Sequence, residues 1–268
     1  MTPVKTSECR SRHGIVAAGL LAAVVTVGQA EQPPAASDLE ALFRANAYEL
    51  VLSDGKLSGA GSDFLLAATE DVPFVCIGEP HNVSDIPRFV SGLFGQLQDR
   101  HGFHYLAIEE GPSITRTVAS EALAKGDDDV RKLAKKRRKA LHFRTVEEVE
   151  MIADVARTSR GSIVGVWGLD RVLDPSALED YLESPAGRDD PQAAFLRERA
   201  EWSADNLSRY DAPRGSAESQ SADRHREDGF KTGFRHEYDR AIAGDGSPAR
   251  VVFRFGHVHM GRLEGKRY

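Results

Sequence analysis

Acidic and imidazole side chains follow four short apolar runs of this 268-residue chain. The runs cover residues 74–77, 105–108, 163–167 and 251–255. The polar residues that follow them are Glu79 and His81, Glu109, Asp170, and His259. Carboxylates and imidazoles are the groups that general acid–base catalysis and metal-assisted hydrolysis require. The four endings therefore predict one site for hydrolytic chemistry.

The runs themselves have the composition of buried strands, because they are rich in β-branched and aromatic residues. Helical spacing of apolar residues separates them, as in residues 85–100, and Thr145 with Glu148 forms a capping box for a later helix. Strands that alternate with helices predict an α/β fold, with a mostly parallel sheet and helices on both faces. Ligands bind beyond the carboxyl ends of such strands, so the four endings should meet in one crevice.

Two of the strand ends carry the same Gly-x-x-His spacing, at residues 78–81 and 256–259. Glycine lets a chain turn sharply away from the sheet and lets a ligand approach the backbone. A histidine just beyond it can then point into the crevice. One such motif occurs by chance in many proteins, but two at predicted strand ends are more specific.

These motifs resemble a superfamily that groups Tiki/TraB proteins, ChaN-like haem-uptake proteins and erythromycin esterases. The resemblance depends on Gly-Glu-Pro-His at 78–81, Ala-Ile-Glu at 107–109 and Phe-Gly-His-Val-His at 255–259. It implies that the catalytic positions are Glu79, His81, Glu109 and His259. Trp-Gly-Leu-Asp170 resembles the esterase branch more loosely. The Glu-x-His spacing is one residue shorter than in the erythromycin esterases and closer to the ChaN-like and Tiki-like branches.

Two mechanisms fit these residues. Either a divalent ion or His81 as general base would activate water, while Glu79 and Glu109 orient His81 or hold the ion. His259 would be a second imidazole ligand or would stabilise the developing oxyanion. The expected metal ligands are His81, Glu109 and His259, a mixed set that suits Zn²⁺ or Mn²⁺. The chain has no Gly-x-Ser-x-Gly motif, which argues against a serine esterase.

Other polar residues have weaker support. Asp170 and Arg88 are candidate substrate-binding residues, although Asp170 could also end a strand and Arg88 could form a structural ion pair. Side chains alternate along a strand, so Glu110 should point away from Glu109, towards solvent or a helix N-terminus. His257 is a weaker candidate ligand. Five further histidines have no supporting cluster, namely His101, His104, His142, His225 and His236.

We therefore expect a hydrolase of an ester or amide bond, acting on a small-molecule or peptide substrate. The alternative is a haem- or iron-binding uptake protein of the ChaN-like type, in which histidine or tyrosine would ligate iron. A binding module without catalytic activity is a third alternative.

Export is expected from residues 1–30, which have a basic start, an apolar run at 15–27 and small residues at 28–30. This is the layout of a secretory signal peptide, and the run is short for a membrane span. Cleavage would leave a periplasmic or secreted protein without stable membrane insertion. Residues 31–37 read as a linker and residues 38–268 as one α/β domain. The chain ends without an apolar helix after the last strand, so we also expect a C-terminal truncation.

The net charge of −6 becomes −8 when the predicted signal peptide, with three basic residues and one acidic residue, is removed. An acidic surface argues against a nucleic-acid partner. The basic run at 135–139 is expected to be a solvated face, with an anion-binding lip as the alternative. Residues 211–229 are polar and predict a mobile loop or lid. Of the two cysteines only Cys76 would remain, so a disulfide within the mature chain is not expected.

Overall fold

The computed structural model describes residues 36–159, 162–213 and 215–260. The predicted signal peptide and most of the predicted linker lie outside these residues. Among the described residues, no helix combines the length and the apolar character that a membrane span needs.

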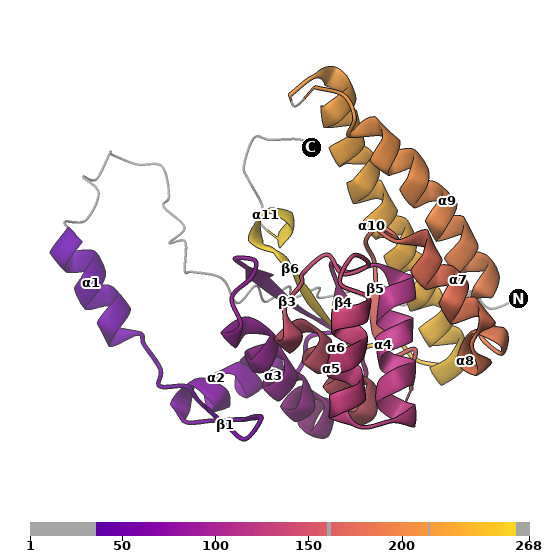
Figure 1. Cartoon of the computed structure of the whole chain (residues 1–268). Coiled ribbons are helices and arrows are strands. Elements are labelled where there is room, and N and C mark those ends of the chain that lie inside the picture. Colours follow the sequence, from indigo (N-terminus) through magenta and orange to yellow (C-terminus); the bar gives the residue numbers. More distant parts are fainter. Residues whose placement is uncertain (1–35, 160–161, 214, 261–268) are drawn as a thin grey trace, which may run out of the picture.

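A four-stranded parallel sheet forms the centre of the fold (Figure 1). Its strands, in spatial order, are β3 (Phe74–Glu79), β6 (Val251–Gly256), β4 (Tyr105–Ile108) and β5 (Val166–Gly168). Glu79 pairs with Gly256, and Ile108 pairs with Gly168. The carboxyl ends of all four strands therefore share one edge of the sheet, and the predicted α/β class is confirmed.

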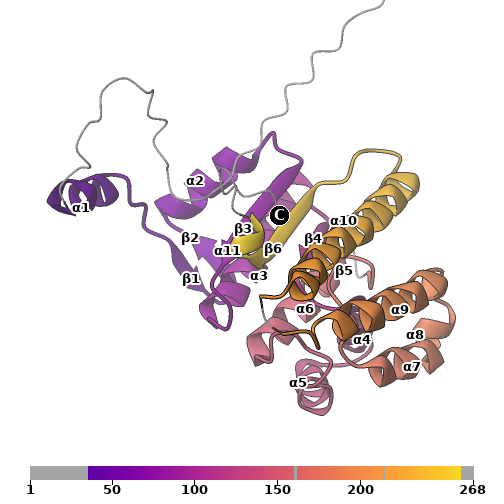
Figure 2. The same cartoon turned by 90° about the horizontal axis from the view of Figure 1, so that it is seen from above.

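One face of the sheet is covered by α3 (Asp85–His101), α4 (Pro112–Ala124) and α6 (Val146–Thr158) (Figure 2). α2 (Ala60–Thr69) and α5 (Asp127–Lys136) pack outside them. Val75, Leu106 and Val252 from the sheet meet Phe94 and Ile152 from the helices in a core that excludes water. Burial of such side chains stabilises the fold by about 1.5–3 kcal/mol each.

The other face is covered by α10 (Ala217–Asp245), which packs against α9 (Ala193–Arg209). Phe230, Phe234 and Tyr238 recur at helical spacing and meet Trp167 and Phe255 from the sheet. β6 lies inside the sheet, so α10, which precedes it, supplies the cover that the last strand was expected to lack. α7 (Pro175–Glu183) packs against α9 and also against α4 of the first face, and α8 (Pro185–Arg188) packs against α7.

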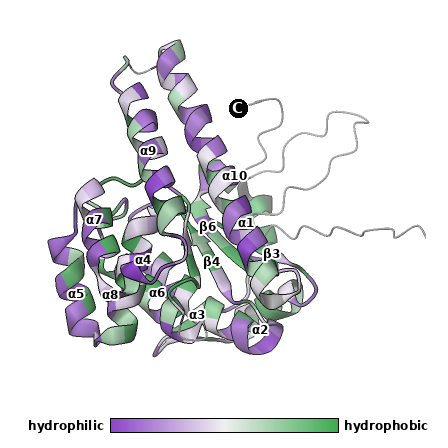
Figure 3. Cartoon of the chain, turned by 90° about the vertical axis from the view of Figure 1, so that its right-hand side faces the viewer, coloured by the Kyte–Doolittle hydropathy of each residue, from purple (hydrophilic) through white to green (hydrophobic). Residues whose placement is uncertain are grey.

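The prediction of a mobile loop or lid over residues 211–229, which was based on Pro213 to Ser216, is wrong for residues 217–229. Residues 217–229 are the first half of α10, whose N-terminus is capped where the Ser216 side chain accepts from the Ser219 N–H. The apolar face of α10 begins only at Phe230, which explains why the polar half carries no helical signal in the sequence. Figure 3 shows α9 and this part of α10 rising side by side beyond the sheet.

A separate hairpin lies at the N-terminal side, with β1 (Val51–Ser53) antiparallel to β2 (Lys56–Ser58). Its turn residues, Asp54 and Gly55, both have positive φ, at 49° and 72°, which is the pattern of a type I′ turn. α1 (Ala36–Ala45) precedes the hairpin and takes up the last two residues of the predicted linker, and α11 (His257–Met260) follows β6.

Candidate functional site

Glu79 and His81 lie where β3 ends, and they contact each other. Glu79 is 1% exposed, and its Oε1 accepts a hydrogen bond from Arg254 Nη2 at 2.7 Å. The same oxygen lies 3.2 Å from His81 Nδ1. A buried carboxylate therefore fixes one ring nitrogen of His81 as the proton donor.

The other ring nitrogen of His81 faces a second carboxylate. Nε2 lies 3.9 Å from Glu109 Oε2, which is too far for a direct hydrogen bond. The ring stacks on Phe143 with centroids 4.5 Å apart, and the side chain remains 35% exposed. His81 is thus held between two buried carboxylates while still open to solvent.

Glu109, directly after β4, is surrounded by hydrogen-bond donors. Its Oε2 accepts from the Gly256 N–H at 3.0 Å, and its Oε1 accepts from Arg226 Nη2 at 2.7 Å. His259 Nε2 lies 3.3 Å from the same Oε1. Burial alone would raise the pKa of Glu109, but these donors outweigh it and lower the pKa to about 2. Glu109 is therefore ionised throughout the neutral range.

His259, on α11, is held by two carboxylates. Its Nδ1 bonds Glu227 on α10, and its Nε2 faces Glu109. The hydrogen bonds to Glu109 and Glu227 raise the pKa of His259 to about 9 despite its partial burial. His259 is therefore an imidazolium at neutral pH.

Asp170, after β5, meets the guanidinium of Arg226 from α10. Arg226 Nε donates to Asp170 Oδ1 at 2.9 Å, and its Nη2 bonds Asp170 Oδ2 as well as Glu109. His142 Nδ1 lies 3.4 Å from Asp170 Oδ2. Burial lowers the pKa of His142, which favours its neutral form.

Glu109, His142 and Asp170 offer three ligand atoms within 4.8 Å of one another, so this group could hold a metal ion. A neutral imidazole with two carboxylates matches the donors that divalent ions take. The Arg226 guanidinium already bridges both carboxylates, however, and would have to move for an ion to bind. This group shares only Glu109 with the metal ligands expected from the sequence, which were His81, Glu109 and His259.

Most of the predicted site residues come together here: Glu79, His81, Glu109, His259 and Asp170. Arg88 does not join them. It lies on α3 with a 56% exposed side chain and pairs with Glu147 at 3.1 Å. The structure thus gives the predicted substrate-binding role of Arg88 no support.

Glu110 does not face solvent, which was one of the two directions expected for it. It is fully buried and accepts from the N–H groups of His142 at 2.9 Å and Phe143 at 2.7 Å. Its burial raises its pKa well above the usual value for a carboxyl group. Glu110 thus shapes the loop that carries His142.

Four members of the site were missed by sequence reasoning, namely His142, Glu148, Arg226 and Arg254. Arg254 had a usable signal, because a charged residue inside an apolar strand needs a buried partner. Glu148 was interpreted as a capping residue, and Arg226 fell in the stretch taken for a loop. His142 carried no local signal.

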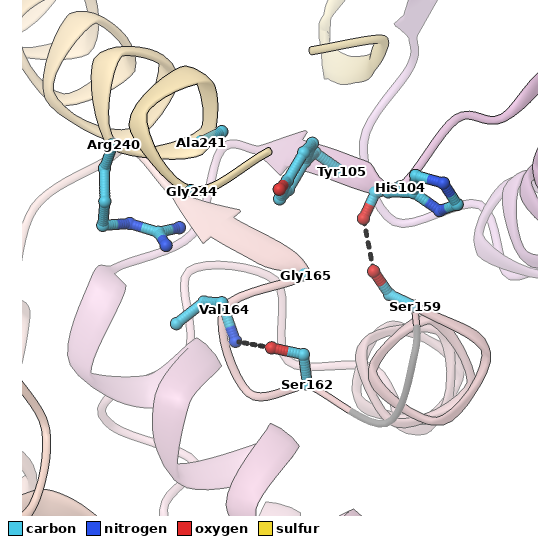
Figure 4. A pocket seen from close by; sticks show the side chains of 9 residues that line it. All are labelled: His104, Tyr105, Ser159, Ser162, Val164, Gly165, Arg240, Ala241 and Gly244. Carbon is cyan, nitrogen blue, oxygen red and sulfur yellow. Dashed lines mark hydrogen bonds between the residues drawn. The ribbon is translucent and has the colours of Figure 1, made fainter. Parts of the chain in front are cut away.

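A separate pocket of about 330 Å³ opens at the opposite edge of the sheet, where β4 and β5 begin (Figure 4). Among its lining residues are Tyr105, Ser159, Ser162 and Arg240. Its position at the amino ends of the strands places it outside the cluster around His81.

No protein-family model and no curated protein matches the chain. Among solved structures, the structure of the type III effector HopBA1 is similar over 78% of this chain and 75% of that chain. The two share 14% sequence identity, with a TM-score of 0.40. A similarity of this size supports no statement about family or function.

Proposed function

We propose that the chain is a hydrolase in which His81 acts as general base on a water that attacks an ester or amide carbonyl. The observation that supports this is the position of His81 between two buried carboxylates of separate strands. As part of this proposal, the chain would belong to the Tiki/TraB, ChaN-like and erythromycin-esterase group that its motifs resemble.

Glu79 would set the tautomer of His81. With Nδ1–H donating to Glu79 Oε1, Nε2 carries the lone pair and can accept a proton. The 3.9 Å between Nε2 and Glu109 Oε2 is a separation that one bridging water can span. Such a water would touch both the base and an anionic acceptor, which would orient it for attack.

Positive charge beside the base suits the next step. Attack on a carbonyl creates an oxyanion, which fixed cations stabilise. His259 stays protonated because its pKa is about 9, and Arg226 lies on the same oxygen of Glu109. Glu109, with a pKa of about 2, would act as an electrostatic anchor, and His259 would be the proton donor to the leaving group.

A bound Zn²⁺ or Mn²⁺ is the metal-assisted form of the same proposal. Glu109, His142 and Asp170 would hold the ion, which would supply Lewis-acid activation of water. We place this form second because Arg226 already provides positive charge to Glu109 and Asp170.

A haem-uptake function of the ChaN-like type is the alternative. Haem iron needs an imidazole nitrogen that is free to ligate it. Both ring nitrogens of His259 contact carboxylates, and the lone pair on His81 Nε2 lies 3.9 Å from the buried carboxylate of Glu109, a setting that suits acid–base chemistry better than iron ligation.

The proposed setting is export to the periplasm or the outside of the cell, with a small-molecule or peptide substrate. The test is hydrolysis of a panel of 4-nitrophenyl esters and 4-nitroanilides by purified chain, before and after chelation of metals. Hydrolysis that survives chelation supports the metal-free form, and hydrolysis restored only by Zn²⁺ or Mn²⁺ supports the metal-assisted form. A Soret absorption band on addition of haem, with no hydrolysis of the panel, would support the uptake alternative instead.

A further inference from the structure

A buried ionic chain lies beneath His81. Arg254, on β6, bonds Glu79 of β3 through Nη2 at 2.7 Å and Glu148 of α6 through Nη1. All three side chains are at most 2% exposed. The residue that orients His81 is therefore tied, through one guanidinium, to a carboxylate on a different layer of the fold.

The side chain of Glu148 lies apart from its expected place. Thr145 caps α6 by accepting from the Glu148 N–H at 3.2 Å, as the capping-box spacing predicted. In a capping box the glutamate side chain would turn back to the capping residue. Here the Glu148 side chain turns inward and accepts a hydrogen bond from Arg254. The second hydrogen bond of the capping box is therefore replaced by the ion pair with Arg254.

This ionic chain of three residues contains two carboxylates and one guanidinium. Glu79 Oε2, Glu148 Oε2 and Arg254 Nε are buried without a hydrogen-bond partner among the described residues. One guanidinium cannot compensate two fully buried carboxylates, so one of them should bind a proton readily. Nothing in the proposed hydrolysis uses such a proton, which leaves the role of Glu148 open.

We propose that Glu148 is a positioning residue for His81, whose charge state sets how firmly Arg254 neutralises Glu79. When Glu148 is protonated, the positive charge of Arg254 neutralises Glu79 alone. When Glu148 is ionised, the two carboxylates share the guanidinium, and Glu79 presents more negative charge to His81. A more negative Glu79 stabilises the imidazolium that forms as His81 takes the proton from water. The predicted effect on hydrolysis rests on the proposed function, whereas the effect of Glu148 on His81 does not.

The charged groups around Glu148 place this change near neutral pH. They are Arg254 from β6, Glu79 from β3, and Glu109 and Glu110 after β4. Burial raises the pKa of Glu148 to about 7, against the opposing effect of Arg254. Glu148 should therefore change charge between pH 5.5 and pH 8.5.

The test compares Glu148→Gln with wild type at pH 5.5 and pH 8.5. Glutamine mimics the protonated form, so both proteins should hydrolyse an active ester of the panel equally at pH 5.5. At pH 8.5 the kcat of Glu148→Gln should be severalfold lower with KM unchanged, because a less negative Glu79 leaves His81 a weaker base. Glu147→Gln, at the half-buried neighbouring residue of α6 that pairs with Arg88 instead of Arg254, is the matched control and should match wild type at both values.

A merely structural role for Glu148 would give the same ratio at both pH values, which would overturn the inference. If wild type hydrolyses nothing on the panel, the proposed function fails, and the inference is read from the imidazole NMR signals of His81, assigned with His81→Gln. These signals should coincide in wild type and Glu148→Gln at pH 5.5 and differ at pH 8.5. Signals that coincide at both values would contradict it. Glu148→Met, neutral and of similar volume, repeats the comparison if the glutamine variant does not fold.

Discussion

The imidazole of His81 occupies the space that a side chain at Gly256 would need. A Cβ at Gly256 would lie 2.6 Å from His81 Nε2 and 3.4 Å from Glu109 Oε2. Gly78 serves a similar close approach, because a Cβ there would lie 3.2 Å from His257 Cα. Neither Gly78 nor Gly256 adopts a positive φ. The glycines of the two Gly-x-x-His motifs are thus needed for room rather than for a left-handed turn.

Gly256→Ala should therefore displace the His81 ring and abolish hydrolysis. The ring is the movable end of a partly exposed side chain, so folding should survive with a modest loss of stability. Activity and thermal melting measure the two effects. Gly95→Ala, in α3 with no atom within 4 Å of an added Cβ, is the control. It should keep full activity and gain about 0.5–1 kcal/mol of stability. A fully active Gly256→Ala would show that the His81 position is not required.

Arg226→Met should destabilise the fold, because it leaves Glu109 and Asp170 buried without their shared cation. Breaking a buried ion pair in this way costs about 3–5 kcal/mol. It should also free both carboxylates for a divalent ion, so calorimetric titration with Zn²⁺ should show tighter binding than in wild type. Arg224→Met, an exposed residue of the same helix, should change neither quantity. Unchanged Zn²⁺ binding in Arg226→Met would argue against a metal site at Glu109, His142 and Asp170.

The free energy of unfolding should decrease at alkaline pH because of His259. Hydrogen bonds to Glu109 and Glu227 raise its pKa from 6.5 to about 9, so the folded state holds the proton more tightly than the unfolded chain. This contribution is fully present below pH 6.5 and is lost as pH rises through 9. Denaturant unfolding between pH 6 and pH 10 should show the decline in wild type and a flatter profile in His259→Gln. An equal decline in both would assign it to other groups.

Glu148 should decrease the free energy of unfolding as the pH rises from 4.5 to 7. Its folded pKa, raised by burial to about 7, lies above the ordinary value of 4.5, so its contribution is greatest below pH 4.5 and is lost as pH rises through 7. Glu148→Gln should be more stable than wild type at pH 8, since glutamine buries no charge. Unfolding at pH 4 and pH 8 checks this. A variant less stable than wild type at pH 8 would mean that the ionised form stabilises the fold.

The sheet was predictable because strand composition is local. The runs that begin at Phe74, Tyr105 and Val251 became β3, β4 and β6 with little change in their bounds, while the third run shortened to Val166–Gly168. Strand order was not predictable, since nothing in the sequence places β6 between β3 and β4. The helical nature of 217–229 was hidden because polar residues dominate it and buried positions such as Ala222 are few.

The site was predictable only where a residue follows a strand. Glu79, Glu109, Asp170 and His259 follow from that rule together with the paired motifs. Arg226 comes from a helix and His142 from a loop, and both reach the site through tertiary packing. Arg254 was visible as a charge within β6, but its partners, Glu79 and Glu148, depend on strand order and on the placement of α6.

His81→Ala tests the central claim most directly. The account predicts that this variant, stripped of metal, loses ester hydrolysis by at least about 100-fold, the range for a general base. Its melting temperature should stay near that of wild type, because substitutions of partly exposed residues usually change stability by less than about 0.5 kcal/mol. His225→Ala, on α10 beside Asp205, is the control and should retain activity. A His81→Ala protein that melts far lower yet hydrolyses ester at the wild-type rate would contradict the account.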